Sequence, residues 1–307
     1  MKFKNLFFIL ILLIFFSGCK LMSPRQTNDF EPEKIEYRTG ATALKMSFLE
    51  NFPKDEIKNG TKFQVMVEVE NQGAYDINNL ELALTGIRQQ YTRVIGDSKK
   101  NVANLPGKSI NFPEGSKEIV SFELENFKRL PKDKHTELIR ISSCYPYQTI
   151  ASAQICINPT MEVAGLSQAQ SVCKADQSIS LSGGQGAPIA VTRIEQTTTP
   201  KDFEKGIYEL ELKIHISNLG KGEVFEESGC KGGKIVKIAD MGFHTFRWGS
   251  GIVCDNKIEL ESKDNILTCT AEINSQMGAF PTPLTIELSY WYQDKVEKTI
   301  EVLKPKE

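Results

Sequence analysis

Histidine, tryptophan and long apolar runs are scarce in this 307-residue sequence. It has three histidines, two tryptophans and no Cys-x-x-Cys pair, and its longest apolar run covers only residues 6–16. The small number of histidines and the lack of a Cys-x-x-Cys pair argue against a zinc site. The apolar run is shorter than the roughly 20 residues that a membrane-spanning helix needs. The sequence also has no large excess of positive or negative charge, because its formal net charge is -2. A nearly neutral chain is not typical of proteins whose main partner is nucleic acid or anionic lipid.

The first 19 residues have the layout of a secretory signal peptide. Two lysines precede the apolar run, and Ser17, Gly18 and Cys19 follow it. This end resembles the lipobox of prokaryotic lipoproteins, in which the cysteine carries a diacylglycerol, although Phe16 stands where leucine is usual. We therefore expect export and lipid attachment at Cys19, which would hold the protein at the outer face of the membrane or the cell surface. The alternative is an uncleaved N-terminal helix as the anchor, with Cys19 a chance residue.

The chain changes character after residue 41. Residues 20–41 have two prolines, mixed charges and no apolar periodicity, as in a flexible tether. Beyond them apolar and polar residues alternate, for example along residues 63–69, and a period of two is typical of a strand with one buried face. Short strands follow one another with turn residues between them. We therefore predict an all-β fold in which residues 42–158 form an immunoglobulin-like β-sandwich.

The second half of the sequence repeats the pattern of the first. An alternating strand followed by Asn-x-Gly occurs at residues 63–73 and again at 208–220, where the asparagines are 147 residues apart. Tyr-Pro-Tyr-Gln at 145–148 matches Tyr-Trp-Tyr-Gln at 290–293, an offset of 145. Two matches at nearly one offset indicate a tandem repeat of one domain.

The repeat predicts a second sandwich at residues 187–305, after a linker at 159–186 that holds Cys173. The strand and turn signatures resemble the immunoglobulin-like repeats of archaeal and bacterial cell-surface proteins, in the style of CARDB modules. The segments that carry this resemblance are residues 46–49, 71–76, 184–191 and 216–222. It implies a sandwich architecture and a role in adhesion, spacing or assembly rather than catalysis, since one sandwich fold hosts many functions.

Six cysteines remain besides Cys19, an even number that predicts disulfides in an exported chain. They are Cys144, Cys156, Cys173, Cys230, Cys254 and Cys269. If residues 147–151 turn a hairpin, Cys144 lies opposite Cys156 at a separation that a disulfide accepts. Pairing Cys156 with Cys173 is an equally open choice.

The remaining pairs follow from a second hairpin and from elimination. Cys254 and Cys269 flank a predicted hairpin at residues 258–267, so we expect them to pair. Cys173 would then join Cys230 and attach the linker to the second sandwich. The alternative use of these cysteines, a metal site, is disfavoured by their spacing.

Two stretches mimic nucleotide-binding motifs. Residues 181–185 read Leu-Ser-Gly-Gly-Gln, as in ABC transporter ATPases, but Gly-Ala-Pro and a strand follow instead of a helix. Gly107-Lys108-Ser109 resembles the end of a P-loop, yet Val102 occupies the place of its first glycine. We expect no nucleotide and no other cofactor.

The three histidines do not suggest an active site. His135 falls in a predicted loop, and His244 is surrounded by aromatic residues. His215 lies on the polar side of its strand, so we expect it to be solvated. None has a recognisable partner nucleophile in the sequence, and we predict a protein that is not an enzyme.

The tryptophans are the candidates for a binding surface. The alternation along residues 284–292 places Trp291 on the outward face of its strand, where it could stack on a glycan or dock a partner, or else pack against the neighbouring domain or a loop. Trp248 is the second candidate. Asn59-Gly60-Thr61 is an N-glycosylation sequon at Asn59, although Asn-Gly is also a common turn.

These observations predict a membrane-anchored extracellular protein with a non-enzymatic role in adhesion, scaffolding or envelope assembly. The alternative is a cell-surface carbohydrate-binding module that uses Trp291 or Trp248. The expected partners are the membrane, through the N-terminal anchor, and an unidentified surface protein or glycan. Nucleic acid and nucleotides are not expected.

Overall fold

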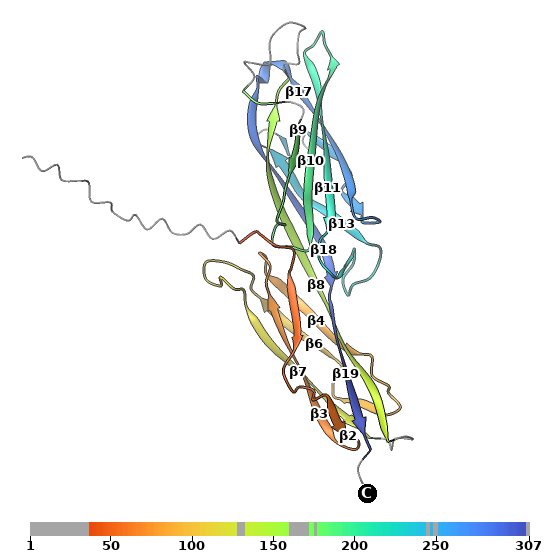
Figure 1. Cartoon of the computed structure of the whole chain (residues 1–307). Coiled ribbons are helices and arrows are strands. Elements are labelled where there is room, and N and C mark those ends of the chain that lie inside the picture. Colours follow the sequence, from red (N-terminus) through yellow and green to blue (C-terminus); the bar gives the residue numbers. More distant parts are fainter. Residues whose placement is uncertain are drawn as a thin grey trace, which may run out of the picture. The chain divides into compact units, whose positions relative to one another are not determined.

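The regular structure is almost entirely β-strand, which confirms the all-β prediction (Figure 1). The computed structural model describes residues 37–127, 133–159, 172–174, 177–243, 246–247 and 251–304. In this part of the chain no helix is long and apolar enough to cross a membrane. The elements in chain order are β1 (Leu44–Phe48), β2 (Glu56–Lys58), β3 (Lys62–Asn71), β4 (Ile77–Thr85), β5 (Thr92–Ile95), β6 (Lys99–Leu105), β7 (Lys117–Asn126), β8 (Lys134–Ile157), β9 (Gln177–Ser180), β10 (Ile189–Asp202), β11 (Ile207–Asn218), β12 (Glu223–Phe225), β13 (Ile235–Phe243), β14 (Phe246–Arg247), β15 (Ile252–Cys254), β16 (Lys257–Glu259), β17 (Asn265–Asn274), the 3₁₀ turn η2 (Ser275–Met277), β18 (Phe280–Gln293) and β19 (Lys295–Leu303).

The first sandwich pairs a four-stranded sheet with part of a larger one. The small sheet has the order β1-β3-β7-β5, and the strands β4, β6, β8, β19 and β2 face it. β1 lies against β19 and β6 against β7. The predicted alternation is seen in β3, where Val65, Val67 and Val69 are fully buried. Burying one face of each strand in this way supplies the main favourable free energy of the core.

The second sandwich repeats this arrangement. A sheet with the order β15-β17-β11-β10-β9 faces β13, β18 and β8, with β10 against β8 and β16 against β17. Leu210, Leu212 and Ile214 of β11 are buried, as Val65, Val67 and Val69 are in β3. The two strands that match in sequence therefore hold central positions in corresponding sheets.

One long antiparallel ribbon runs through both sandwiches. β8 has 24 residues, and it pairs with β18 from Phe280↔Ile157 to Tyr292↔Tyr145 and with β19 from Lys295↔Ser142 to Leu303↔Lys134. The register does not shift where β18 passes into β19, so the two behave as one strand opposite β8. Figure 1 shows β8 beside β18 and β19 along this length. We call the pair the ribbon.

The ribbon does not follow the predicted domain boundaries, which ended the first sandwich at residue 158 and began the second at residue 187. β19 belongs by sequence to the second unit, but it pairs with β2 and the first part of β8. The last part of β8 belongs by sequence to the first unit, but it pairs with β18. The alternation continues without a break along β8, because alternation reports only which face of a strand is buried and not which sheet it joins.

The predicted hairpin at residues 147–151 is wrong. These residues lie within the continuous strand β8, and Tyr147, Thr149 and Ala151 are all buried on one face. The segment lacks the Gly, Asn or Asp residues that a tight hairpin turn needs at positive φ. The second predicted hairpin, at residues 258–267, is also wrong, because β16 pairs with β13 while β17 pairs with β15 and β11.

Candidate functional site

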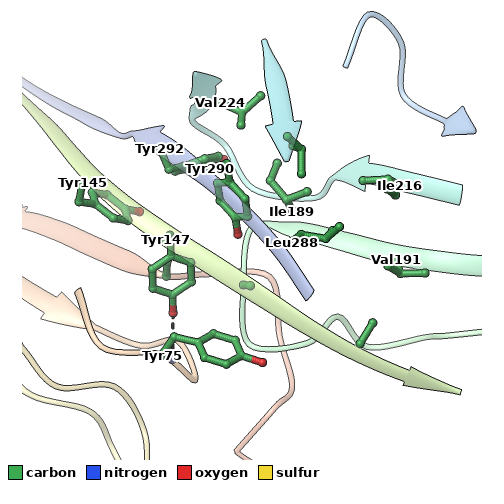
Figure 2. Close-up of a cluster of buried hydrophobic side chains, with 14 of the residues drawn as sticks. Tyr75, Tyr145, Tyr147, Ile189, Val191, Ile216, Val224, Leu288, Tyr290 and Tyr292 are labelled. Carbon is green, nitrogen blue, oxygen red and sulfur yellow. Dashed lines mark hydrogen bonds between the residues drawn. The ribbon is translucent and has the colours of Figure 1, made fainter. Parts of the chain in front are cut away.

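The sandwiches meet around the middle of the ribbon, where an Asn-x-Gly turn closes on a ribbon tyrosine. At the end of β3, the Gly73 amide donates to Asn71 Oδ1 (3.1 Å) and Asn71 Nδ2 donates to the Tyr75 carbonyl (2.8 Å). The Tyr75 amide then donates to the Tyr147 hydroxyl (3.3 Å), the contact drawn in Figure 2. The turn is thereby attached to β8.

A second turn repeats these contacts at the end of β11. The Gly220 amide donates to Asn218 Oδ1 (3.1 Å), and Asn218 Nδ2 donates to the Gly222 carbonyl (2.9 Å). The Gly222 amide donates to the Tyr292 hydroxyl (3.0 Å), which in turn donates to Asn218 Oδ1 (3.0 Å). The Asn-x-Gly match in the sequence therefore corresponds to a repeated hydrogen-bonding pattern.

Four buried tyrosines gather where the two turns close. Tyr145 lies opposite Tyr292 in the ribbon, and Tyr147 lies opposite Tyr290 (Figure 2). Neighbouring rings have centroids 5.9 to 6.3 Å apart; the Tyr145–Tyr292 pair is tilted, and the other three pairs have the edge-on geometry that aromatic rings favour. Burial raises the pKa of the Tyr145 and Tyr290 hydroxyls well above the usual value, so they stay neutral donors. The cluster packs the junction between the two sandwiches.

Asp294, between β18 and β19, is a partly buried carboxyl beside this cluster. Its Oδ2 accepts a hydrogen bond from the Tyr145 hydroxyl (2.7 Å), and its backbone pairs with Ser143 of β8. Burial raises the pKa of Asp294 to about 6, although the bond from Tyr145 acts in the opposite direction.

A groove of about 440 Å³ lies next to Asp294. It runs between the start of β1, the turn at Leu219, Gly220 and Lys221, and the passage from β18 to β19. Lys45, Lys221 and Lys295 line it together with Asp294. Lys45 is 3.6 Å from Glu70, so its charge is already partly balanced.

A second groove, of about 340 Å³, contains Trp291, and we call it the Trp291 groove. Its walls come from β4, β6, β8, β18 and the loop before β13. The residues that line it include Asn79, Glu81, Asn101, Cys144, Gly229 and Trp291. The predicted orientation of Trp291 is confirmed: Tyr290 and Tyr292 are buried, and Trp291 is half-buried on the opposite face.

The three disulfides settle the alternatives that the sequence left open. Cys156 pairs with Cys173 (Cα–Cα 5.7 Å), as one of the two predicted choices had it. The pairing of Cys144 with Cys156 was the other choice and is wrong, because both residues lie on one continuous strand. Cys230 does not pair with Cys173; it joins Cys144 (Cα–Cα 5.8 Å) and ties the loop before β13 to the ribbon.

The pairing of Cys254 with Cys269 is confirmed. The two residues lie directly opposite each other on β15 and β17, with their Cα atoms 4.3 Å apart. The hairpin from which we predicted this pair does not exist, yet the residues meet because β15 adds to the edge of β17. Three disulfides indicate an oxidising compartment.

The other predicted residues have simpler outcomes. Asn59 and Gly60 form the turn between β2 and β3, and Gly60 has the positive φ (78°) expected of an Asn-Gly turn. Cys19 and Trp248 lie outside the described residues, as does His244.

His215 corrects one expectation. Its side chain lies on the face of β11 that points away from the hydrophobic core, as expected. It is nevertheless buried, with 2% of its surface exposed, rather than solvated. Asp264 lies 2.9 Å from its Nδ1, and Arg193 and Glu195 of β10 cover its other side. The strand pattern could not reveal this cover, because Asp264 lies in a loop that precedes β17.

His135 lies in β8 rather than in the predicted loop, and it pairs with a buried carboxyl. Its Nε2 lies 2.8 Å from Oε2 of the fully buried Glu137, and its ring contacts Tyr91. Glu137 also accepts a hydrogen bond from the Arg88 amide. Among the residues that the structure describes, no group of three or more histidine, cysteine or acidic side chains is arranged to hold a metal ion.

Comparison with known proteins gives distant likenesses only. No family model matches the chain, and no curated protein matches it significantly. Red sea bream transglutaminase is similar at 11% identity and a TM-score of 0.22, over 87% of this chain and 32% of that one. The CupB6 tip adhesin from Pseudomonas aeruginosa is similar at 10% identity and a TM-score of 0.20, over 88% of this chain and 99% of that one. The chain thus spans about a third of the transglutaminase, and TM-scores this low establish no shared fold.

Proposed function

We propose that this chain is an exported, membrane-anchored surface protein with a non-enzymatic role in adhesion, scaffolding or envelope assembly. The observation that carries the proposal is the ribbon, which is shared by both sandwiches. A protein that presents binding surfaces on two domains in a fixed arrangement needs a junction between those domains that resists bending. Two tandem domains joined by one flexible linker would not provide it.

Three features of the junction favour rigidity. The ribbon crosses it with an unbroken register, and the buried tyrosine cluster packs its middle. The Cys144–Cys230 disulfide then ties a loop of the second sandwich to a strand that begins in the first. Relative rotation of the sandwiches would have to break strand pairing, aromatic packing and a covalent constraint together. The ribbon would therefore keep binding surfaces on the two sandwiches in a fixed arrangement, while the tether sets how far they reach from the membrane.

The location rests on the cysteines and the N-terminal sequence. Disulfides persist outside the reducing cytosol, and the N-terminal layout favours export. We propose that Cys19 carries the lipid anchor and that residues 20–41 act as a tether. An uncleaved N-terminal helix is the alternative anchor.

Cross-linking on intact cells tests the proposal. A membrane-impermeant amine reagent should react with the exposed lysines before lysis, and mass spectrometry should find links either between copies of the chain or to one surface protein. A Cys19→Ala variant should appear in the medium if the lipid is the anchor and stay with the membrane if the helix is. The proposal fails if the chain reacts only after the cells are lysed.

Carbohydrate binding is a second candidate, favoured by a specific observation. Trp291 lies in a groove with amide and carboxylate side chains rather than in a packed interface. This candidate is compatible with a surface role, because envelope glycans are within reach of an anchored protein.

A further inference from the structure

We propose that the Trp291 groove is a binding site for a neutral oligosaccharide. The proposal rests on the proposed surface function, and it identifies the class of partner that the surface protein binds. A pyranose ring has an apolar C–H face and a rim of hydroxyls, so its site needs an aromatic platform beside uncharged donors and acceptors. The strand register places these two kinds of side chain in adjacent rows on one outward face.

The first row is apolar. Trp291 lies directly opposite Pro146 of β8 on one side and Phe225 of β12 on the other. All three are half-buried, and directly opposed residues of antiparallel strands project to the same side of the sheet. Of the three, Trp291 lines the groove, and an aromatic ring of this kind binds a flat ligand face at little cost in side-chain entropy.

The second row is polar. Asn101 of β6 lies opposite Glu81 of β4, and Glu81 lies opposite Cys144 of β8. Both asparagines of the groove, Asn79 and Asn101, are exposed, and each amide offers two donors and an acceptor to hydroxyls. The Glu81 carboxylate is 2.8 Å from Lys99. Because that charge is already paired, the groove favours a neutral ligand over an ion.

The backbone around the groove supplies an independent indication. Three non-glycine residues in the described part of the chain have positive φ, and two of them lie here: Asn79 (φ 55°) and Cys230 (φ 53°). β4 and β6 stop pairing at Asn79, although Asn78 and Leu80 on either side remain paired. Backbone held in such sparsely populated regions concentrates at ligand sites. Here the Cys144–Cys230 disulfide holds one wall in place.

The location also fits a ligand site. The groove lies where the two sandwiches meet, and small-ligand sites are common at such boundaries. Its walls come from the ribbon, from strands next to it and from a loop that the Cys144–Cys230 disulfide ties to the ribbon, so the site is largely formed before a ligand arrives. A preformed site loses little free energy to ordering on binding.

The experiment uses the full chain with Trp248→Phe, so that Trp291 is the only tryptophan. Cellohexaose, chitohexaose, laminarihexaose and mannohexaose are titrated while emission and iodide quenching are followed. We expect at least one of them to change the emission in a saturable way and to protect Trp291 from iodide. Stacking of the sugar on the indole would cause both effects.

Isothermal calorimetry with that sugar then tests the residues. Trp291→Ala and Asn79→Gly should each weaken binding at least about tenfold. The glycine variant removes the amide but accepts positive φ without strain, so it folds even if the tryptophan variant does not. Thr285→Ala is the matched control, because Thr285 lies on the outward face of the same strand outside the groove, and it should bind normally.

Two results would overturn the proposal: no hexasaccharide giving saturable binding, or either groove variant binding as tightly as the wild type. Neither result would touch the surface location, since intact-cell labelling measures that independently. Labelling only after lysis would instead remove the proposed function and leave the measured affinity standing.

Discussion

Gly73 and Gly220 pack directly against the hydroxyl groups of two tyrosines of the ribbon, Tyr147 and Tyr292. A Cβ at Gly73 would overlap the Tyr147 hydroxyl, and one at Gly220 would overlap the Tyr292 hydroxyl. We expect Gly73→Ala and Gly220→Ala each to lower the free energy of unfolding by about 1–3 kcal/mol, because a packed junction must move to admit a methyl group. Urea denaturation measures the change.

Gly233→Ala is the control for this pair. The nearest atom to a Cβ there, in the Ile235 side chain, is 3.4 Å away, an ordinary contact. Its unfolding midpoint should stay close to that of the wild type. Equal effects at all three glycines would mean that the tyrosine contact is not the cause.

Asp294 makes stability depend on pH. Its pKa is raised to about 6 in the folded protein from an ordinary value of 3.8, so the folded state binds the proton more tightly than the unfolded state. The free energy of unfolding therefore falls as pH rises from about 4 to about 6 and stays lower above that range. We expect Asp294→Asn to be more stable than the wild type at pH 7.5, by up to about 3 kcal/mol, and to lose this part of the pH dependence.

Urea denaturation of both proteins at pH 4.5 and pH 7.5 measures this difference. The asparagine oxygen can still accept the hydrogen bond from Tyr145, so the variant isolates the charge. Asp97→Asn, at an exposed position in the loop before β6, serves as the control and should follow the wild type at both pH values. A variant less stable than the wild type at pH 7.5 would contradict the argument.

At the scale of single elements, alternation predicted strands well. The buried face of β3 and β11 and the outward face of Trp291 follow directly from a period of two. The burial of His215 could not be predicted from this period, because Asp264 and Arg193 approach it from other parts of the chain. The groove around Trp291 was likewise unpredictable beyond its tryptophan, since β4 and β6 reach it only through the pairing of β4 with β8.

The Cys144–Cys230 disulfide is the covalent constraint on the ribbon. It closes a sequence separation of 86 residues, whereas Cys254–Cys269 closes 15. Because a longer closed loop restricts the unfolded chain more, we expect Cys144→Ala with Cys230→Ala to cost about 2–5 kcal/mol, and more than the corresponding change at Cys254 and Cys269. Thermal unfolding of the two double variants compares them; a smaller loss at Cys144 and Cys230 would contradict this assignment.

At the scale of the whole molecule, we expect the shared ribbon to make the two sandwiches unfold as one cooperative unit. Ile300 of β19 is 1% exposed in the first sandwich. We expect Ile300→Ala to lower the free energy of unfolding by about 2–5 kcal/mol and to speed amide exchange in β11 and β17 of the second sandwich as well. Hydrogen exchange with mass spectrometry reads both sandwiches in one experiment.

Ile119→Ala is the matched control. Ile119 is also an isoleucine in a strand of the first sandwich, but it is 56% exposed, so its loss should leave exchange unchanged. Faster exchange confined to the first sandwich of Ile300→Ala would show that the sandwiches unfold separately. The sharing of strands could not be predicted from the sequence, because an offset near 147 indicates two similar units and not which partners their last strands choose.

The ribbon also determines the order in which parts of the chain can fold during synthesis. Residues 134–157 leave the ribosome long before residues 280–303, their partners along the whole ribbon. In many proteins the N-terminal domain folds first, but here the first sandwich cannot be completed before β19, which follows the strands of the second sandwich, has been made. Until then β8 presents an unpaired edge that invites aggregation. Such a chain is suited to translocation in an unfolded state, followed by folding of both halves at once.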